Sequence, residues 1–245
     1  MRQGVPVGDE PRSVWDRPER GARGPAPERS RAEITAVAVG LADSGGLSAV
    51  SMRQVARRLG TGPASLYRYV ATRDDLLDLM ADAVAGEIDL SVPPTGDPVS
   101  DLVALAGRAK RVYLAHPWML DLPTEPTLGP HGVDYLEYTL AALAPASLPP
   151  RTQIETVGLV NGLVTLFART ELRRRSAQTD PQLTYAAALA ATVTPDRHPF
   201  IVATMTASTD GTDPEDTHSL FERMLRRVLT GLVEPPRPVA GSSPT

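Results

Sequence analysis

Three signals for the start of a helix follow one another in the first third of the 245-residue chain. Each joins a hydroxyl side chain to an acidic or amide side chain three residues later: Ser30 with Glu33, Ser51 with Gln54, and Thr72 with Asp75. At this spacing both side chains can pair with backbone N–H groups that a helix leaves free at its start. Apolar residues follow each signal at steps of three and four. The sequence therefore predicts a helix after each signal.

Helix patterns continue along the rest of the chain. Asp97, Asp180 and Asp213 each precede a proline, so that a capping carboxylate stands before a residue suited to the first helical position. The apolar periodicity between these steps predicts five more helices, at about 98–115, 130–143, 150–175, 181–193 and 214–232. No alternating strand pattern of useful length occurs. We therefore expect an all-α fold.

The segment 51–70, SMRQVARRLGTGPASLYRYV, is the most informative part of the sequence. An amphipathic helix ends at Leu59, a turn over residues 60–62 follows, and Pro63 begins a short second helix that runs to about Tyr69. Gly60 permits a left-handed turn there. This order is typical of a helix-turn-helix, whose second helix enters the major groove of DNA. The alternative is an ordinary helical hairpin, which also needs a glycine and a small residue at the turn.

The distribution of charge favours the DNA-binding interpretation. The net charge of the chain is −4, but residues 1–73 carry +5 and residues 74–245 carry −9. Between Asp43 and Asp74 there is no acidic residue, whereas five arginines fall there: Arg53, Arg57, Arg58, Arg68 and Arg73. A local basic surface of this kind is what a polyanionic partner requires.

Several classes of protein are disfavoured by what the sequence lacks. It has no cysteine, and its first thirty residues lack the apolar stretch of a signal peptide. The longest nearly apolar run, 157–168, is too short to span a bilayer and contains Asn161 and Thr165. We expect a cytoplasmic protein with no cofactor and no metal. His131, Asp134 and Glu137 follow at three-residue steps, but such a series drifts around a helix and is common on surfaces.

Residues 31–88 resemble the DNA-binding domain of the tetracycline-repressor (TetR) family of bacterial transcriptional regulators. The resemblance rests on GLSAVSMRQVARRLGTGPASLYRYVATRDDLLDLMADAV, and further on HPWMLDLP at 116–123, GPHGVDYLEYTLAAL at 129–143 and an Asn-Gly helix at 154–168. The later segments resemble the regulatory domain of the branch closest to the tetracycline repressor. The resemblance implies an all-helical homodimer with an N-terminal domain that reads DNA and a C-terminal domain that dimerises and binds an inducer.

Matched to the family, ten residues are expected to contact DNA. They lie at the start of the second helix, along the third helix and at the start of the fourth: Ser51, Arg53, Pro63, Ala64, Ser65, Tyr67, Arg68, Tyr69, Thr72 and Arg73. An arginine such as Arg68 can pair with O6 and N7 of guanine, and the helix start at Thr72 favours phosphate. For Leu66 and Val70 we expect burial. Arginines before residue 30 either follow a minor groove or only add charge.

A second set of residues is expected to bind the inducer. In a chain with only 4% aromatic residues, rings and polar groups gather around two helices and a proline break: Tyr113, His116, Trp118, Met119, Tyr135, Tyr138, Asn161, Thr165 and Phe167. Such a cluster is typical of an apolar pocket. Taken singly, Trp118 and Phe167 are also typical core residues. Asn161 is the best single candidate, because a buried amide needs partners.

The sequence therefore divides into five parts: a flexible Arg/Pro/Gly-rich arm at 1–29, a helix-turn-helix domain at 30–73, a connecting helix and linker at 74–96, a ligand-binding and dimerisation domain at 97–233, and a disordered tail at 234–245. Gly158 and Gly162, with the apolar stripe from Leu220 to Leu232, either form a four-helix dimer interface or pack within one chain. Dimerisation is favoured because one short reading helix contacts too little DNA.

The sequence predicts a ligand-responsive transcriptional regulator, a repressor rather than an enzyme, with double-stranded DNA, a small-molecule inducer and a second copy of the chain as partners. No membrane partner is expected. Two alternatives remain. One is an all-α enzyme or small-molecule carrier that retains a helix-turn-helix-like hairpin, although no catalytic motif supports it. The other is a DNA-binding protein without an inducer.

Overall fold

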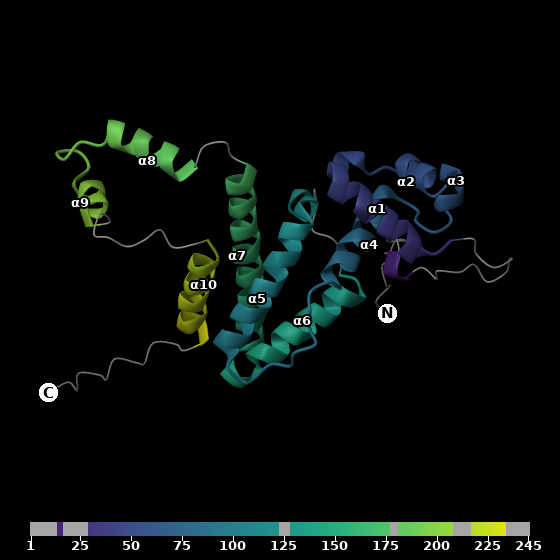
Figure 1. Cartoon of the computed structure of the whole chain (residues 1–245). Coiled ribbons are helices and arrows are strands. Elements are labelled where there is room, and N and C mark those ends of the chain that lie inside the picture. Colours follow the sequence, from purple (N-terminus) through teal and green to yellow (C-terminus); the bar gives the residue numbers. More distant parts are fainter. Residues whose placement is uncertain (1–13, 17–28, 123–127, 177–180, 208–216, 234–245) are drawn as a thin grey trace, which may run out of the picture. The chain divides into compact units, whose positions relative to one another are not determined.

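The computed structural model describes residues 14–16, 29–122, 128–176, 181–207 and 217–233, and every regular element in these ranges is a helix (Figure 1). The all-α prediction is confirmed. The described residues form two compact units, one within 1–95 and 111–142 and the other within 96–110 and 143–245. We call them the first and the second unit.

The first unit contains the helix-turn-helix. Its elements are the 3₁₀ helices η1 (Val14–Asp16), η2 (Leu47–Ala49) and η3 (Pro117–Asp121), and the α-helices α1 (Arg31–Gly45), α2 (Met52–Arg58), α3 (Pro63–Leu66), α4 (Arg73–Ala85) and α6 (Pro130–Leu143), together with the end of α5 (Pro98–Ala115). Helix α1 packs against α2 and α4, and α2 packs against α3. The sequence thus correctly predicted four helices between residues 30 and 90.

The three predicted helix starts are confirmed by their hydrogen bonds. The hydroxyl groups of Ser30, Ser51 and Thr72 accept from the backbone N–H groups three residues later. At Thr72 the capping is reciprocal, because its own N–H donates to the Asp75 carboxylate over 3.0 Å. These bonds satisfy backbone donors that a helix start leaves unpaired. They also fix where α2 and α4 begin.

One apolar core holds the helix-turn-helix together. Leu66 and Val70 are fully buried, as predicted, and pack with Ile34 of α1 and Leu76 of α4. Gly60 has φ +68°, so the left-handed turn predicted between α2 and α3 is also confirmed. The burial of Leu66 leaves the adjacent positions of α3 facing solvent, which is what a reading helix requires.

The predicted flexible arm at 1–29 holds a packed segment. Val14 is 1% exposed within the core of the first unit, and its carbonyl accepts from Nη1 of Arg31 over 3.2 Å. The next residue, Trp15, lies so close to Gly129 that a Cβ there would stand 2.5 Å from its ring. For residues 14–16 the expectation of an unpacked arm is therefore wrong. The expectation failed because most residues next to Val14 in the sequence are polar, whereas the core that Val14 completes is formed by residues far from it in the chain.

The second unit contains most of α5 and the helices α7 (Pro150–Ser176), α8 (Pro181–Thr192), α9 (Pro199–Ala207) and α10 (Thr217–Val233), with the 3₁₀ turn η4 (Ala144–Ala146). Its buried apolar side chains include Leu102 and Leu105 of α5, Val160 of α7, and Phe221 and Leu225 of α10. Part of the apolar stripe on α10 thus packs within the chain, against α7. Phe221 also meets Phe167 edge to face, with 5.2 Å between ring centroids.

Most helix limits agree with the sequence, but α3 ends at Leu66 rather than at about Tyr69, because residues 67–69 form a turn. Helices α5 and α6 have the predicted bounds, and α7 and α8 differ from them by one residue. Helix α9 was not predicted, and the Asp213-Pro214 step lies outside the described residues. The division at residue 96 would place α6 in the C-terminal domain, whereas by its contacts α6 falls in the first unit.

A buried ion pair links α5 to α7. Lys110 is only 3% exposed, and its Nζ lies 3.1 Å from Oε2 of Glu171 and 4.8 Å from the centre of the Phe221 ring. Burial raises the pKa of Glu171, but hydrogen bonds and charge from Lys110 and Arg175 outweigh it, so the pKa lies below its ordinary value of 4.5. The pair therefore stabilises the second unit when Glu171 is ionised.

We expect the stability of the second unit to depend on this ionisation. Because the folded-state pKa of Glu171 is depressed, its contribution is present above pH 4.5 and is lost as the pH falls through the folded pKa. Glu171→Gln should remove this part of the acid sensitivity while destabilising the protein at pH 7. Denaturant unfolding at several pH values between 3 and 7 measures both effects. An unchanged pH profile in the variant would contradict the assignment.

Candidate functional site

Helix α3 and the turn that follows it present an exposed surface made of predicted reading residues. Pro63, Ala64 and Arg68 are exposed, and the side chain of Tyr67 is 52% exposed. Tyr69 differs, because it is half-buried and packs against the core of the first unit. The side chains available to a DNA base are therefore those of Pro63, Ala64, Tyr67 and Arg68.

Two contacts fix the ends of this surface. At the start of α3, the hydroxyl groups of Thr61 and Ser65 lie 2.9 Å apart and hydrogen bond to each other. Beyond its end, Nε of Arg31 donates to the carbonyl oxygen of Tyr69 over 3.0 Å. Arg31 also holds Val14, so that α1 connects the N-terminal segment to the reading helix. Sequence reasoning missed Arg31 because its acceptors are backbone atoms of distant residues.

The predicted phosphate contacts lie at the starts of α2 and α4. Arg53 and Arg73 are exposed, and Nη2 of Arg73 lies 3.4 Å from the carbonyl oxygen of Leu47. Ser51 and Thr72 use their hydroxyl oxygens as helix caps, as described above. Both helix starts can offer backbone N–H groups and a cation to a phosphate.

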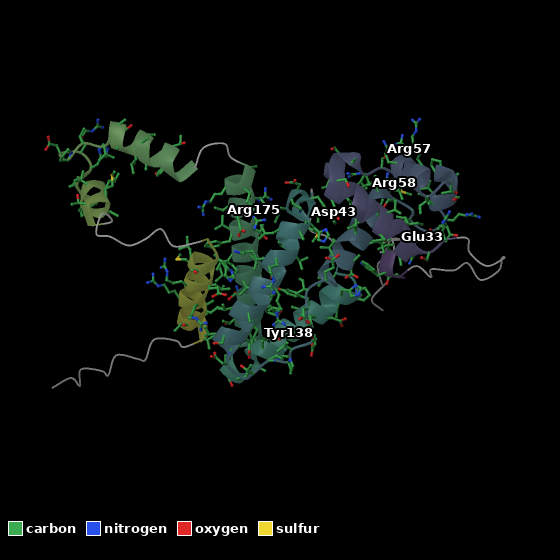
Figure 2. All side chains as sticks on the ribbon, in the orientation of Figure 1. Glu33, Asp43, Arg57, Arg58, Tyr138 and Arg175 are labelled. Carbon is green, nitrogen blue, oxygen red and sulfur yellow. The ribbon has the colours of Figure 1, made fainter. Side chains whose placement is uncertain are left out.

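Two further arginines belong to the basic surface. Arg57 and Arg58 are exposed on the last turn of α2, where Figure 2 labels them. The acid-free stretch of the sequence includes both, but they match none of the residues carried over from the family. The first unit thus combines an exposed reading helix with arginines on α2, just after α3 and at the start of α4.

Six of the predicted inducer-binding residues lie in the first unit. His116, at 9% exposure, and Trp118, at 2%, are buried, and Met119 packs against the core of the first unit. The hydroxyl of Tyr138 donates to the carbonyl oxygen of Val92 over 2.6 Å (Figure 2 labels Tyr138). Trp118 is thus a core residue of the unit that contains the helix-turn-helix. Tyr113 and Tyr135, in the same unit, are half-buried.

The other three predicted inducer-binding residues belong to α7 in the second unit. Asn161, Thr165 and Phe167 are all half-buried there, and Phe167 packs against Phe221. A ligand role for any of the nine residues stays a prediction. A separate cleft of about 560 Å³ in the first unit runs between α1 and α4 and is lined by none of the nine.

His116 connects three elements of the first unit. Its Nδ1 lies 2.7 Å from Oδ1 of Asp43 at the end of α1, and its Nε2 lies 2.9 Å from Oε2 of Glu87 after α4. Nε1 of Trp118 donates to the same oxygen of Asp43 over 2.7 Å. We call Asp43, Glu87, His116 and Trp118 the histidine clamp. Its members are up to 75 positions apart, and no sequence signal joined them.

The surroundings of His116 change its ionisation. Burial lowers the pKa of His116, but the hydrogen bonds and negative charges of Asp43 and Glu87 outweigh it, so the pKa lies above the ordinary value of 6.5. His131 makes a simpler pair, with Nδ1 2.9 Å from Oδ2 of Asp82. Within the described residues, no three histidine, aspartate or glutamate side chains gather as they would around a metal ion.

The sequence matches two family descriptions over most of its length. Residues 34–80 match "Bacterial regulatory proteins, tetR family", and residues 91–235 match "Tetracyclin repressor-like, C-terminal domain". A relative named HTH-type transcriptional repressor DrrR1, from Streptomyces coeruleorubidus, is 34% identical over 231 residues, which cover 89% of this chain and 83% of that protein.

Solved structures of ActR, a TetR family protein from Streptomyces coelicolor, share the fold. The complex of ActR with actinorhodin has a TM-score of 0.70 and 28% identity, and covers 85% of this chain and 97% of ActR. The complex with (S)-DNPA has a TM-score of 0.69 and 29% identity, and covers 85% of this chain and 98% of ActR. None of the helices that the structure describes has both the length and the apolar character needed to cross a bilayer.

Proposed function

The chain belongs to the tetR family of bacterial regulatory proteins, and we propose that it is a cytoplasmic transcriptional repressor. In this proposal it binds a palindromic DNA operator as a homodimer and leaves it when a small-molecule inducer binds. The observation that carries the proposal is the exposed reading surface of α3, flanked by arginines in a stretch of 30 residues without an acid.

The chemistry of the reading surface supports sequence-specific recognition. Arg68 can donate two hydrogen bonds to a guanine, whereas Ala64 and the ring of Tyr67 can contact the methyl group of a thymine. Arg53 and Arg73 supply charge at two helix starts, which suits phosphate and sets the register of α3 on the duplex. Base contacts and phosphate contacts thus come from different residues.

An exposed apolar face on α7 supports the homodimer. Ile154, Leu159 and Leu166 are 55%, 42% and 57% exposed, and they share this face with Gly158 and Gly162. A Cβ at either glycine would meet nothing within 4 Å. Large apolar side chains beside two glycines form a surface on which a second helix can approach closely. A two-fold dimer would also present two reading helices to the two halves of a palindrome.

An inducer is supported by the relatives. ActR, at 28–29% identity, has been crystallised with actinorhodin and with (S)-DNPA, both of which are named in its structures. We propose that this chain binds its own inducer in the C-terminal domain, near Asn161 and Thr165 of α7. Because DNA and inducer would favour different conformations, each would weaken binding of the other by the same factor.

Gel retardation on the DNA upstream of the gene tests this function. We expect sequence-specific retardation at about 150 mM salt, with an affinity that falls steeply as salt rises. An unrelated DNA fragment of equal length is the control. Equal retardation of both fragments, or of neither, would contradict the repressor and favour an architectural protein or a carrier. Actinorhodin and (S)-DNPA are the first compounds to add, and release of the operator would support induction.

A further inference from the structure

The histidine clamp joins the end of α1 to the segment after α4. Asp43 belongs to the last turn of α1, and Glu87 follows the end of α4 by two residues, whereas His116 leads directly into η3. All the members of the clamp are in the first unit, which also contains the reading surface. The clamp therefore acts on the helices that frame the helix-turn-helix.

The two hydrogen bonds of the imidazole ring require its charged form. Both ring nitrogens of His116 face carboxylate oxygens, which can only accept hydrogen bonds when ionised. A neutral imidazole has one N–H, so that its other nitrogen would direct a lone pair at a carboxylate. Only the imidazolium ion can donate to Asp43 and Glu87 at once. Loss of one proton therefore breaks one of the two connections.

The position of Asp43 connects the clamp to the DNA-contacting residues. Four positions after it, Leu47 begins η2, and the carbonyl oxygen of Leu47 lies 3.4 Å from Nη2 of Arg73. The same short helix leads to Ser51, the cap of α2. A change at the end of α1 is thus passed along a few residues to the starts of both α2 and α4.

We propose that His116 is a positioning residue for DNA binding, and that its imidazolium ion holds α1 and the end of α4 in the arrangement that binds the operator. The inference rests on the proposed function and adds to it a dependence on proton concentration. Closing the clamp orders η3 against α1 before DNA arrives, so that less order has to be gained on binding. Deprotonation opens the contact with Glu87 and weakens operator binding.

The direction of the pH effect follows from the raised pKa of His116. The clamp is complete below pH 6.5, the ordinary value, and opens as the pH rises through the higher folded value. The charged groups that face the ring are Asp43 from α1 and Glu87 from the segment after α4. His131 is the other histidine of the first unit, and it faces Asp82 instead.

Glu87→Gln is the decisive variant. The amide of glutamine can donate to Nε2 of a neutral imidazole, whose Nδ1–H still donates to Asp43, so the clamp stays closed at high pH. For the natural protein we expect operator affinity to fall about fivefold between pH 6.5 and pH 9, the lower end of the usual range for coupled sites. In Glu87→Gln this fall should be absent. Glu137→Gln, with the same charge change, and His131→Gln should retain it.

Two readouts without DNA separate the clamp from the proposed function. The NMR signal of the His116 ring should titrate above pH 6.5 in the natural protein and at lower pH in Glu87→Gln. The thermal unfolding midpoint of the natural protein should fall more at high pH than that of Glu87→Gln. Equal profiles in both proteins would overturn the clamp. Normal profiles with an operator affinity that does not change with pH would overturn its role in DNA binding, and absence of specific DNA binding at any pH would overturn the proposed function itself.

Discussion

Arg68→Ala is expected to reduce operator affinity more than any other single change on the reading surface. A bidentate arginine–guanine pair contributes about 1–3 kcal/mol of discrimination. A homodimer places Arg68 in both halves of the operator, and well-separated positions add. The loss is therefore about 2–6 kcal/mol, or roughly 30-fold to 10⁴-fold in the dissociation constant. Preference at one base position of each half-site should relax at the same time.

Arg73→Ala is the matched comparison for this variant. Arg73 lies at the start of α4, where it is expected to contact phosphate, so its loss should weaken binding to all sequences alike. The slope of log affinity against log salt should decrease by about one per subunit. Titrations of an operator and its base variants at several salt concentrations measure both quantities. If Arg68→Ala, like Arg73→Ala, weakens binding equally to the operator and to all its base variants, Arg68 does not read a base.

Trp118→Ala is expected to destabilise the first unit by about 3–5 kcal/mol, because removing a fully buried ring leaves a cavity. Trp118 is 2% exposed in the same core as Leu66 and Val70, and it also donates a hydrogen bond to Asp43. Denaturant unfolding, followed by a signal of the first unit, measures the loss. This variant is therefore a poor probe of inducer binding, for which Asn161→Leu is better suited.

Two further substitutions serve as controls for Trp118→Ala: one removes only the N–H of Trp118, and the other truncates an exposed ring. Trp118→Phe keeps most of the ring but removes the N–H, and should cost about 1–3 kcal/mol because Asp43 loses one donor. Phe200→Ala truncates an aromatic ring that is 86% exposed, and should change stability by less than about 0.5 kcal/mol. A loss below about 1 kcal/mol for Trp118→Ala would contradict its assignment to the core.

The sequence predicted those parts of the fold that local chemistry determines. Capping pairs such as Thr72 with Asp75 act within three residues, so they placed helix starts correctly. The left-handed turn at Gly60 and the burial of Leu66 were also predicted from neighbouring residues. Helix α9 was missed because it is apolar all round and lacks the one-sided period by which other helices were found.

Contacts between distant residues could not be predicted. The candidate DNA surface is contiguous in sequence, which is why pattern and resemblance together defined it. The clamp joins Asp43 to His116 across 73 positions, and a single sequence contains no information on that pairing. The sequence left Trp118 open between an inducer pocket and the core; the structure places its ring in the core around the helix-turn-helix, and its role in inducer binding stays a prediction.

The buried Val14 sets the minimum length of a stable DNA-binding fragment. The family match begins at residue 34, but the apolar core is completed by a side chain twenty positions earlier. A polypeptide trimmed to the match would lose this side chain and the capped start of α1, together with Arg31, which donates to the Tyr69 carbonyl beyond the reading helix. A DNA-binding fragment of this chain therefore needs to begin before Val14.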